Sequence, residues 1–200
     1  MKKKLEMLKD NRGIWVLLGA CGICFAILIF VIFGGLLIFA PHVNNSTRNT
    51  LSNIGINLNQ SAPNLPITLV NGTSVNLSDF RGRPVVLWFM VTWCSSCAYG
   101  AQLLALQYYS KIHAKGAVIL TVELYNNLGA SGPTLQSFAN QYGGGLNKTG
   151  WLYGTTTQNA TYEYDPNAFL DIYYVINSNG IIVNEGPELS ANLDNIVSSI

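Results

Sequence analysis

The chain has 200 residues, of which 49% are hydrophobic and only 10% are charged, and its formal net charge is +1 at pH 7. This length allows one membrane segment and one domain of ordinary size. The sequence after residue 40 contains no basic patch, so nucleic acid is excluded as an expected partner.

The N-terminal part combines basic residues with a long uncharged segment. Residues 1–13 contain five Lys or Arg residues against two acidic ones, and no charged residue occurs from Ile14 to Ala40. A helix of that length spans about 40 Å, more than the hydrocarbon core of a bilayer requires. Because basic flanks stay in the cytoplasm, we predict a cytoplasmic basic segment (1–13), one transmembrane anchor (14–40) and an extracytoplasmic remainder. A cleaved signal peptide is the alternative, but the apolar stretch is long and lacks an A-x-A-like site at its end.

A first C-x-x-C pair, Cys21 and Cys24, lies within this predicted anchor. One interpretation is a relay of electrons across the bilayer. The other, which we favour, is packing of small residues against a neighbouring helix, because a thiol in lipid is hard to ionise.

Residues 41–64 are rich in Asn and Ser and show no sustained periodicity, which predicts a polar extracytoplasmic linker. The part outside the anchor also contains many N-x-[ST] sequons. Some arise by chance in so Asn-rich a chain, but their density predicts a glycosylated surface protein. The sequons begin at Asn44, Asn45, Asn59, Asn71, Asn76, Asn147 and Asn159.

Residues 65–200 alternate apolar runs with turn signals, as is typical of an α/β domain. The predicted elements are a hairpin around Asn71-Gly72, a strand (85–91), a helix (98–111), a strand (117–125), a helix (133–142), a short strand (151–153), a hairpin (171–176 with 180–184) and a helix (187–200). This order predicts a mixed β-sheet flanked by helices on both faces.

A second C-x-x-C pair, Cys94 and Cys97, lies between the strand 85–91 and the helix after it. A cysteine near a helix start meets unpaired N–H groups and the helix dipole, which can lower a thiol pKa from ~8.5 to ~3.5–7.5. Cys97 lies on the same helical face, close enough to form a disulfide. The pair therefore predicts dithiol–disulfide exchange.

Two other interpretations of this pair compete. A zinc site needs four ligands, which the sequence outside the anchor does not offer at a suitable spacing, so no metal and no cofactor are expected. A purely structural disulfide is the stronger alternative, but a bridge across so small a loop adds little stability.

Two motifs flank the strand 85–91: Leu77-Ser78-Asp79-Phe80-Arg81-Gly82-Arg83-Pro84 before it and Trp93-Cys94-Ser95-Ser96-Cys97 after it. Together with the element order they resemble the thioredoxin superfamily, and most of all its membrane-anchored TlpA/ResA-like branch. The resemblance covers about residues 62–200 and implies a thioredoxin-like fold. It also implies that Cys94 is the exposed attacking thiolate, that Cys97 is the buried resolving thiol, and that Trp93 supports them.

The sequence departs from this family where a proton relay is expected. Trp88 stands where thioredoxins carry a buried Asp, and Gly100 stands where ResA-like proteins often carry a Glu. Glu123, near the end of the next strand, is the candidate replacement, and a solvated strand-end carboxylate is the alternative.

A third departure concerns the cis-proline that the family places opposite the dithiol. We expect Asp171 at this position, with Pro166 as the alternative. A carboxylate beside Cys94 would oppose the thiolate and raise its pKa, which favours a reductant over a strong oxidant.

The expected function is a membrane-tethered, extracytoplasmic thiol–disulfide oxidoreductase that acts on protein substrates, more as a reductase or isomerase than as a strong oxidase. It would need a membrane redox partner that supplies or removes electrons. One alternative is a Sco-like copper-binding assembly protein, whose C-x-x-x-C and distal His are absent from the sequence. Another is a non-enzymatic surface protein with a structural disulfide. A peroxiredoxin-type peroxidase would need T-x-x-C, whereas Thr92 lies two residues before Cys94.

Overall fold

The structure, a computed structural model, describes residues 53–200. The predicted cytoplasmic segment, the anchor with Cys21 and Cys24, the first part of the linker and the sequons at Asn44 and Asn45 lie outside the described residues. Within residues 53–200, no helix is both long enough and apolar enough to cross a membrane.

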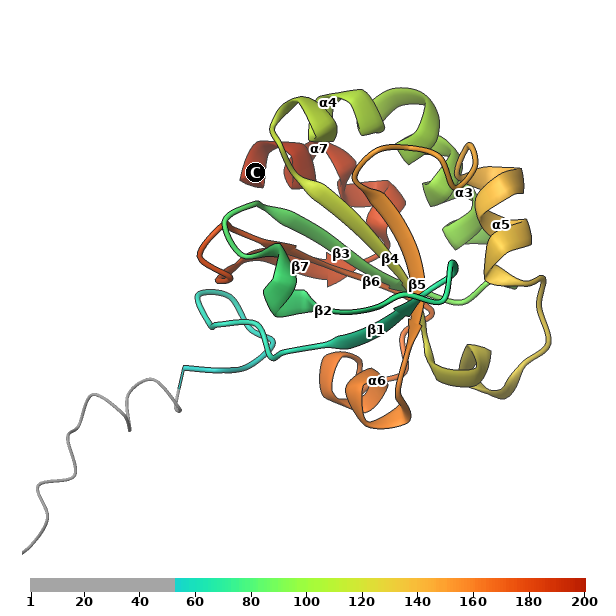
Figure 1. Ribbon diagram of the computed structural model, residues 1–200, viewed down its shortest axis with the longest axis horizontal. Helices are drawn as coiled ribbons and strands as arrows, with labels where there is room; N and C mark the ends of the chain where they lie inside the picture. The colour runs from blue at the N-terminus through green and yellow to red at the C-terminus, as the bar shows by residue number, and fades with distance from the viewer. Residues whose placement is uncertain (1–52) are drawn as a thin grey trace, which may run out of the picture. The chain divides into compact units, whose positions relative to one another are not determined.

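The described residues form one seven-stranded mixed sheet in the order β2-β1-β5-β4-β3-β6-β7 (Figure 1). β3 is parallel to β4, and β4 is parallel to β5, whereas all other neighbours are antiparallel. The strands are β1 (Pro66–Leu69), β2 (Ser74–Asn76), β3 (Val85–Met90), β4 (Val118–Glu123), β5 (Trp151–Thr156), β6 (Asp171–Ile176) and β7 (Ile182–Pro187). The prediction of a mixed sheet is confirmed.

Helices lie on both faces of this sheet, as predicted. In Figure 1, α6 lies on the opposite side of the sheet from α3, α4, α5 and α7. The helical elements are η1 (Leu77–Phe80), α3 (Ser95–Leu103), η2 (Leu104–Tyr108), α4 (Tyr109–Ala114), η3 (Tyr125–Gly129), α5 (Leu135–Tyr142), α6 (Gln158–Tyr164) and α7 (Leu189–Ser199).

β3 is the strand around which the core is built. All six of its residues are buried, because helices cover the sheet on both sides. Successive side chains point to opposite faces. Phe89 meets the Tyr164 ring of α6 at a centroid distance of 5.2 Å, whereas Trp88 points to the face that carries α3 and α7 and bonds to Asp171 there.

Several elements differ from the sequence-based prediction. The helix expected over 98–111 begins at Ser95, and its middle part, η2, is a π-helical turn. Helix α6 was not predicted, because only three of its residues are buried and no sustained apolar period marks it. Thr157, whose side chain accepts a hydrogen bond from the Ala160 N–H, is the N-cap that the sequence does show.

The described end of the expected linker is not a free tether. The N–H of Asn59 bonds to the carbonyl of Ile182 at 2.9 Å, and the N–H of Ala62 bonds to the carbonyl of Gly180 at 3.0 Å. Ala62 and Pro63 are buried. Residues 59–62 thus cover the start of β7, an edge strand that would otherwise expose unpaired backbone groups. The packing of the domain thus extends into residues 59–62 of the segment that was expected to be a linker.

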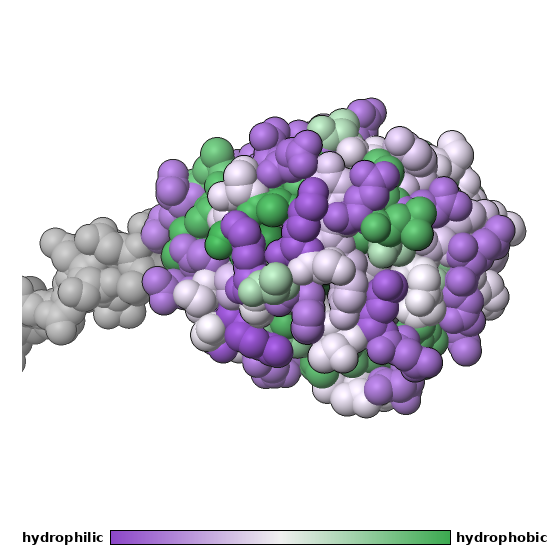
Figure 2. Space-filling model, turned by 90° about the horizontal axis from the view of Figure 1, so that it is seen from above, coloured by the Kyte–Doolittle hydropathy of each residue, from purple (hydrophilic) through white to green (hydrophobic). Residues whose placement is uncertain are grey.

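The surface of the domain mixes polar side chains with small separate apolar groups on the face shown in Figure 2. All sequon asparagines within the described residues are exposed, namely Asn59, Asn71, Asn76, Asn147 and Asn159. Exposure is a requirement for glycan attachment, and glycosylation itself stays a prediction.

The hydroxyl of Tyr164 donates a hydrogen bond to the carbonyl of Pro63 and thereby ties α6 to the N-terminal segment. We expect Tyr164→Phe to lower the free energy of unfolding by about 1 kcal/mol, because a buried carbonyl loses its donor. Denaturant unfolding measures this change. Tyr162→Phe is the matched control on the same helix, since that ring is 60% exposed. Equal effects of the two substitutions would contradict the assignment.

Candidate active site

Cys94 and Cys97 lie at the first turn of α3, immediately beyond the C-terminal end of β3. Cys94 is the N-cap residue, and its sulfur accepts a hydrogen bond from the Cys97 N–H at 3.3 Å. The same sulfur lies 3.0 Å from the Ser96 hydroxyl. Donors at a helix N-terminus favour negative charge on the group that they face. The N-cap position thus provides donors to Cys94, as the sequence predicts for a cysteine at a helix start.

The two sulfurs differ in access. Cys94 is 7% exposed, less than the sequence suggested, whereas Cys97 is fully buried. Both are free thiols. The thiol of Cys97 donates to the carbonyl of Leu170 at 3.2 Å. Cys94 is therefore the sulfur of the pair that an incoming disulfide reaches first.

Burial is the main cause that raises the pKa of Cys97 far above its ordinary value. The negative charge of Asp171 is the second cause, and the hydrogen bond and charge of Cys94 add to it. Cys97 is accordingly a protonated thiol in the reduced protein. It can attack only after a base has taken its proton.

Asp171 is the buried carboxylate next to this thiol. It is 5% exposed, and its Oδ1 accepts hydrogen bonds from Trp88 Nε1 at 2.7 Å and from the Leu189 N–H at 3.2 Å. Its Oδ2 is buried and has no hydrogen-bond partner within residues 53–200. Burial raises the pKa of Asp171, the two hydrogen bonds oppose this shift, and the charge of Glu188 adds to it. The Oδ2 atom of Asp171 is thus free to accept or release a proton, and burial favours the protonated form of this carboxyl group.

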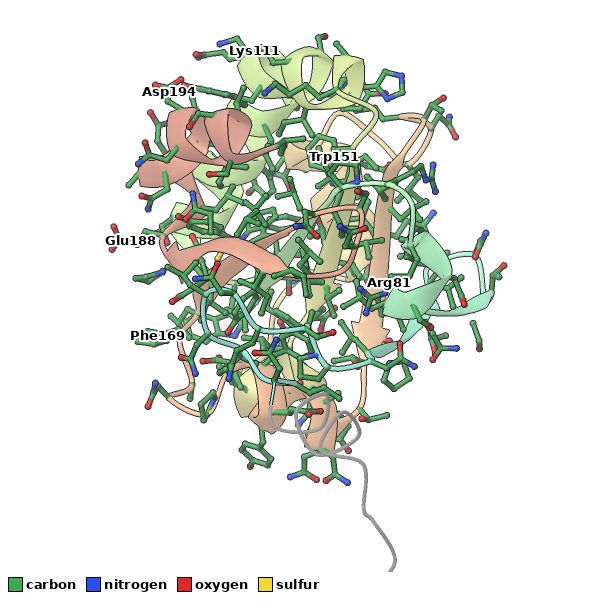
Figure 3. All side chains as sticks on the ribbon, turned by 90° about the vertical axis from the view of Figure 1, so that its left-hand side faces the viewer. Arg81, Lys111, Trp151, Phe169, Glu188 and Asp194 are labelled. Carbon is green, nitrogen blue, oxygen red and sulfur yellow. The ribbon has the colours of Figure 1, made fainter. Side chains whose placement is uncertain are left out.

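The structure places Asp171 rather than Pro166 beside the dithiol. Pro166 is exposed in the turn after α6, whereas Asp171 directly follows Leu170, the residue that binds the Cys97 thiol. The sequence-based argument paired Asp171 with Cys94; its charge instead acts on Cys97. Phe169 precedes Asp171 by two residues, and the charge of Glu188 acts on Asp171. Figure 3 shows that Phe169 and Glu188 project from the same side of the molecule.

Two of the departures from the family pattern have a structural reason. Trp88 of β3 donates a hydrogen bond to Asp171, so β3 contacts the carboxylate but does not carry it. A Cβ at Gly100 would lie 3.3 Å from Leu189 Cδ2, which shows that α3 and α7 pack closely there and leave little room for a longer side chain. The buried carboxylate thus lies on β6 in this protein, whereas the family pattern places it on the strand that corresponds to β3.

Glu123, the candidate base from sequence, is less suited to this role. It pairs with Met90 in the sheet register, and Asp171 pairs with the same residue from the other side. The two carboxylates are thus two strands apart, about 10 Å in the backbone. Half-burial raises the pKa of Glu123, but the carboxylate that acts on Cys97 is Asp171.

A left-handed turn after β4 supports the residues just before Cys94, and the sequence-based analysis missed it. Asn126, Asn127 and Leu128 have φ of 53°, 51° and 54°. This conformation costs a residue such as Leu128 roughly 1–2 kcal/mol, and Asn less. Two successive asparagines were the available signal, because Asn is enriched in this region. Trp93, expected beside the cysteines, donates from its Nε1 to the Asn127 carbonyl at 2.9 Å.

The fold agrees with what comparison with known proteins shows. The model of the AhpC/TSA family matches residues 58–184, and the chain belongs to this family. Its fold is thioredoxin-like: a thioredoxin-like protein from Aeropyrum pernix superimposes with a TM-score of 0.55 at 20% identity, over 80% of this chain and 99% of that one. BsSco, of the Sco family of cytochrome c oxidase assembly proteins, gives 0.53 at 16% identity, over 70% and 91%.

Among curated proteins, the chain is similar to the thiol-disulfide oxidoreductase ResA of Bacillus thuringiensis subsp. konkukian. The two are 29% identical over 99 residues, which are 50% of this chain and 54% of ResA. The chain thus spans about half the length of this relative.

The raised pKa of Asp171 makes stability depend on pH. The folded protein holds this proton more tightly than the unfolded chain, so the contribution of Asp171 is complete below the ordinary Asp pKa of about 3.9 and is lost as pH rises toward the higher folded value. We expect the stability of Asp171→Asn relative to wild type to increase as pH rises above the ordinary Asp pKa. Denaturant unfolding at several pH values measures this gain. Glu163→Gln, an exposed carboxylate on α6, is the control. A wild-type minus variant difference that does not change with pH would contradict the burial of charge.

Proposed function

We propose that this protein is a membrane-tethered, extracytoplasmic thiol–disulfide oxidoreductase that exchanges disulfides with protein substrates. The observation that carries the proposal is the asymmetric thiol pair at the start of α3, with the more accessible sulfur at the N-cap and the buried one beside a carboxylate. The ResA relatives support this chemistry. The basic residues before the uncharged segment 14–40 support the tether.

The reaction follows from the positions of the two sulfurs. The Cys94 thiolate attacks one sulfur of a substrate disulfide, forms a mixed disulfide and releases the other substrate sulfur as a thiolate. The proton of Cys97 passes to Asp171, and the resulting Cys97 thiolate attacks the Cys94 sulfur. A Cys94–Cys97 disulfide forms, and the second substrate thiolate leaves and takes up a proton. The substrate gains two electrons from the protein. A dithiol partner at the membrane then supplies two electrons that reduce the Cys94–Cys97 disulfide again.

The electrostatics favour reduction of substrates over their oxidation. A strong oxidant has a reduced form that is stabilised, as when its thiolate is well accommodated. Here burial and the charge of Asp171 disfavour a thiolate at Cys97, so the reduced pair gains little from ionisation. Ionisation of Cys97 thus adds nothing to the stability of the reduced pair, and for this reason we propose a reductase or isomerase rather than a strong oxidase.

Substitution of each cysteine separates the two steps. We expect Cys94→Ser to abolish insulin reduction by the full chain. We expect Cys97→Ser to form the mixed disulfide but not to release it, because the resolving sulfur is gone. Turbidity assays and non-reducing gels measure both outcomes. Undiminished activity of Cys94→Ser would refute the proposal, and tight stoichiometric copper binding by the reduced chain would favour the Sco-like alternative.

Asp171 acts in the second step. We expect Asp171→Asn to slow release of the mixed disulfide by at least about tenfold near neutral pH, because an amide cannot accept the Cys97 proton. The loss should shrink as pH rises, since hydroxide then replaces the carboxylate. Rapid-quench measurement of the mixed disulfide tests this, with Glu123→Gln as the matched carboxylate control. Equal effects of both substitutions would show that Asp171 has no special role.

A further inference from the structure

The two residues that precede Cys94 are held by one residue from a distant part of the chain, Asn127. The side-chain oxygen of Asn127 accepts from the Thr92 N–H at 2.9 Å, and its side-chain NH2 donates to the Thr92 hydroxyl at 2.9 Å. Its backbone carbonyl accepts from Trp93 Nε1 at 2.9 Å. The backbone, side chain and ring of this short segment are thus all bonded to a single residue.

This contact depends on the left-handed turn. Asn127 directs its side chain and its carbonyl toward the same segment because Asn126, Asn127 and Leu128 all have positive φ. Strained backbone of this kind persists only where the surroundings enforce it, and it is concentrated at functional sites. Here the turn contacts the two residues that precede the reactive cysteine.

A second loop closes over the same two residues. A Cβ added at Gly132 would lie 2.4 Å from the Thr92 hydroxyl and 3.1 Å from the Trp93 nitrogen, so the chain passes there at close range. Thr92 is 3% exposed as a result. The Cys94 N–H in turn bonds to the Val91 carbonyl at 3.3 Å, so a shift of Thr92 within this turn moves Cys94 as well.

We infer that Asn127 is a positioning residue, which fixes the Cys94 sulfur at the N-terminus of α3 by clamping Thr92 and Trp93. The inference rests on the proposed thiol exchange. A clamp of this kind acts on the reaction in two ways. It keeps the sulfur within reach of the Cys97 N–H in the reduced protein, and it keeps the same sulfur in line for attack by Cys97 in the mixed disulfide.

Two glycine substitutions in the same turn test the clamp. Asn127→Gly removes the side-chain bonds to Thr92 but suits positive φ and keeps the carbonyl that binds Trp93. Asn126→Gly is the matched control, because it makes the same backbone change at the preceding left-handed residue, whose side chain is exposed and has no hydrogen bond among the described residues. The full chain is used for both.

We expect Asn127→Gly to lower the second-order rate constant of insulin reduction at least about fivefold, since small displacements of a reacting group are costly. We also expect its equilibrium with glutathione to shift at least about threefold toward the Cys94–Cys97 disulfide, because the reduced form loses a well-placed donor. Asn126→Gly should stay within about twofold of wild type in both. If the two variants behave alike, or if the glutathione equilibrium of Asn127→Gly is unchanged, the inference is wrong.

Thr92→Val provides an independent test from the other side of the contact. It removes the hydroxyl that receives the Asn127 side chain, preserves the shape of the residue and should shift the glutathione equilibrium in the same direction as Asn127→Gly. If Asn127→Gly does not fold, an unshifted equilibrium in Thr92→Val overturns the inference. The glutathione equilibrium needs no protein substrate. A wild-type chain that exchanges with glutathione but does not reduce insulin would therefore contradict the proposed function, while the glutathione equilibria of the variants would still decide the clamp.

Discussion

The burial of β3 on both faces determines where the chemistry of this protein lies. A strand with helices on both sides has no solvent-facing side chains, so its polar functions can appear only where the strand ends. Cys94 comes four residues after Met90, the last residue of β3, and the chain there turns directly into α3. The helix N-terminus, its unpaired donors and the reactive sulfur therefore coincide at one edge of the sheet.

The same burial explains why the carboxylate matters. On the face of β3 that carries α3 and α7, Trp88 donates its indole N–H to Asp171, which reaches it from the neighbouring strand β6. A carboxylate in this position is costly to ionise, and it makes the adjacent Cys97 costly to ionise too. Both groups therefore bind a proton more tightly than they would in water, and Asp171 accepts the Cys97 proton only when it is itself ionised. Transfer of the Cys97 proton to an ionised Asp171 leaves one buried negative charge. Loss of that proton to water would leave two negative charges side by side, which costs more.

The sequence was sufficient for the features that depend on local pattern. Apolar runs predicted β3 and β4 to within one or two residues, and the Cys94–Cys97 pair was correctly expected near a helix start, because both signals lie in contiguous residues. Helix α6 was missed because about two turns of mostly exposed residues have no sustained apolar period to detect. The partners of the site could not be found in this way. The contacts of Asp171 with Trp88 and of Asn127 with Thr92 join residues 83 and 35 positions apart, and they exist only after the sheet has formed.

The arrangement also explains how one sulfur can serve in two opposite roles. Cys94 must be a nucleophile toward the substrate and then an electrophile toward Cys97, and the second role needs the two sulfurs in line at close range. A cysteine on a flexible loop would meet the first demand and fail the second. An N-cap residue meets both, because the helix fixes Cys97 one turn away and the contact of Thr92 with Asn127 fixes the chain on the other side. The turn with positive φ at Leu128 costs conformational free energy, but it positions Cys94 for attack by Cys97. This second attack must be fast, because otherwise the released substrate thiol attacks the mixed disulfide and reverses the first step.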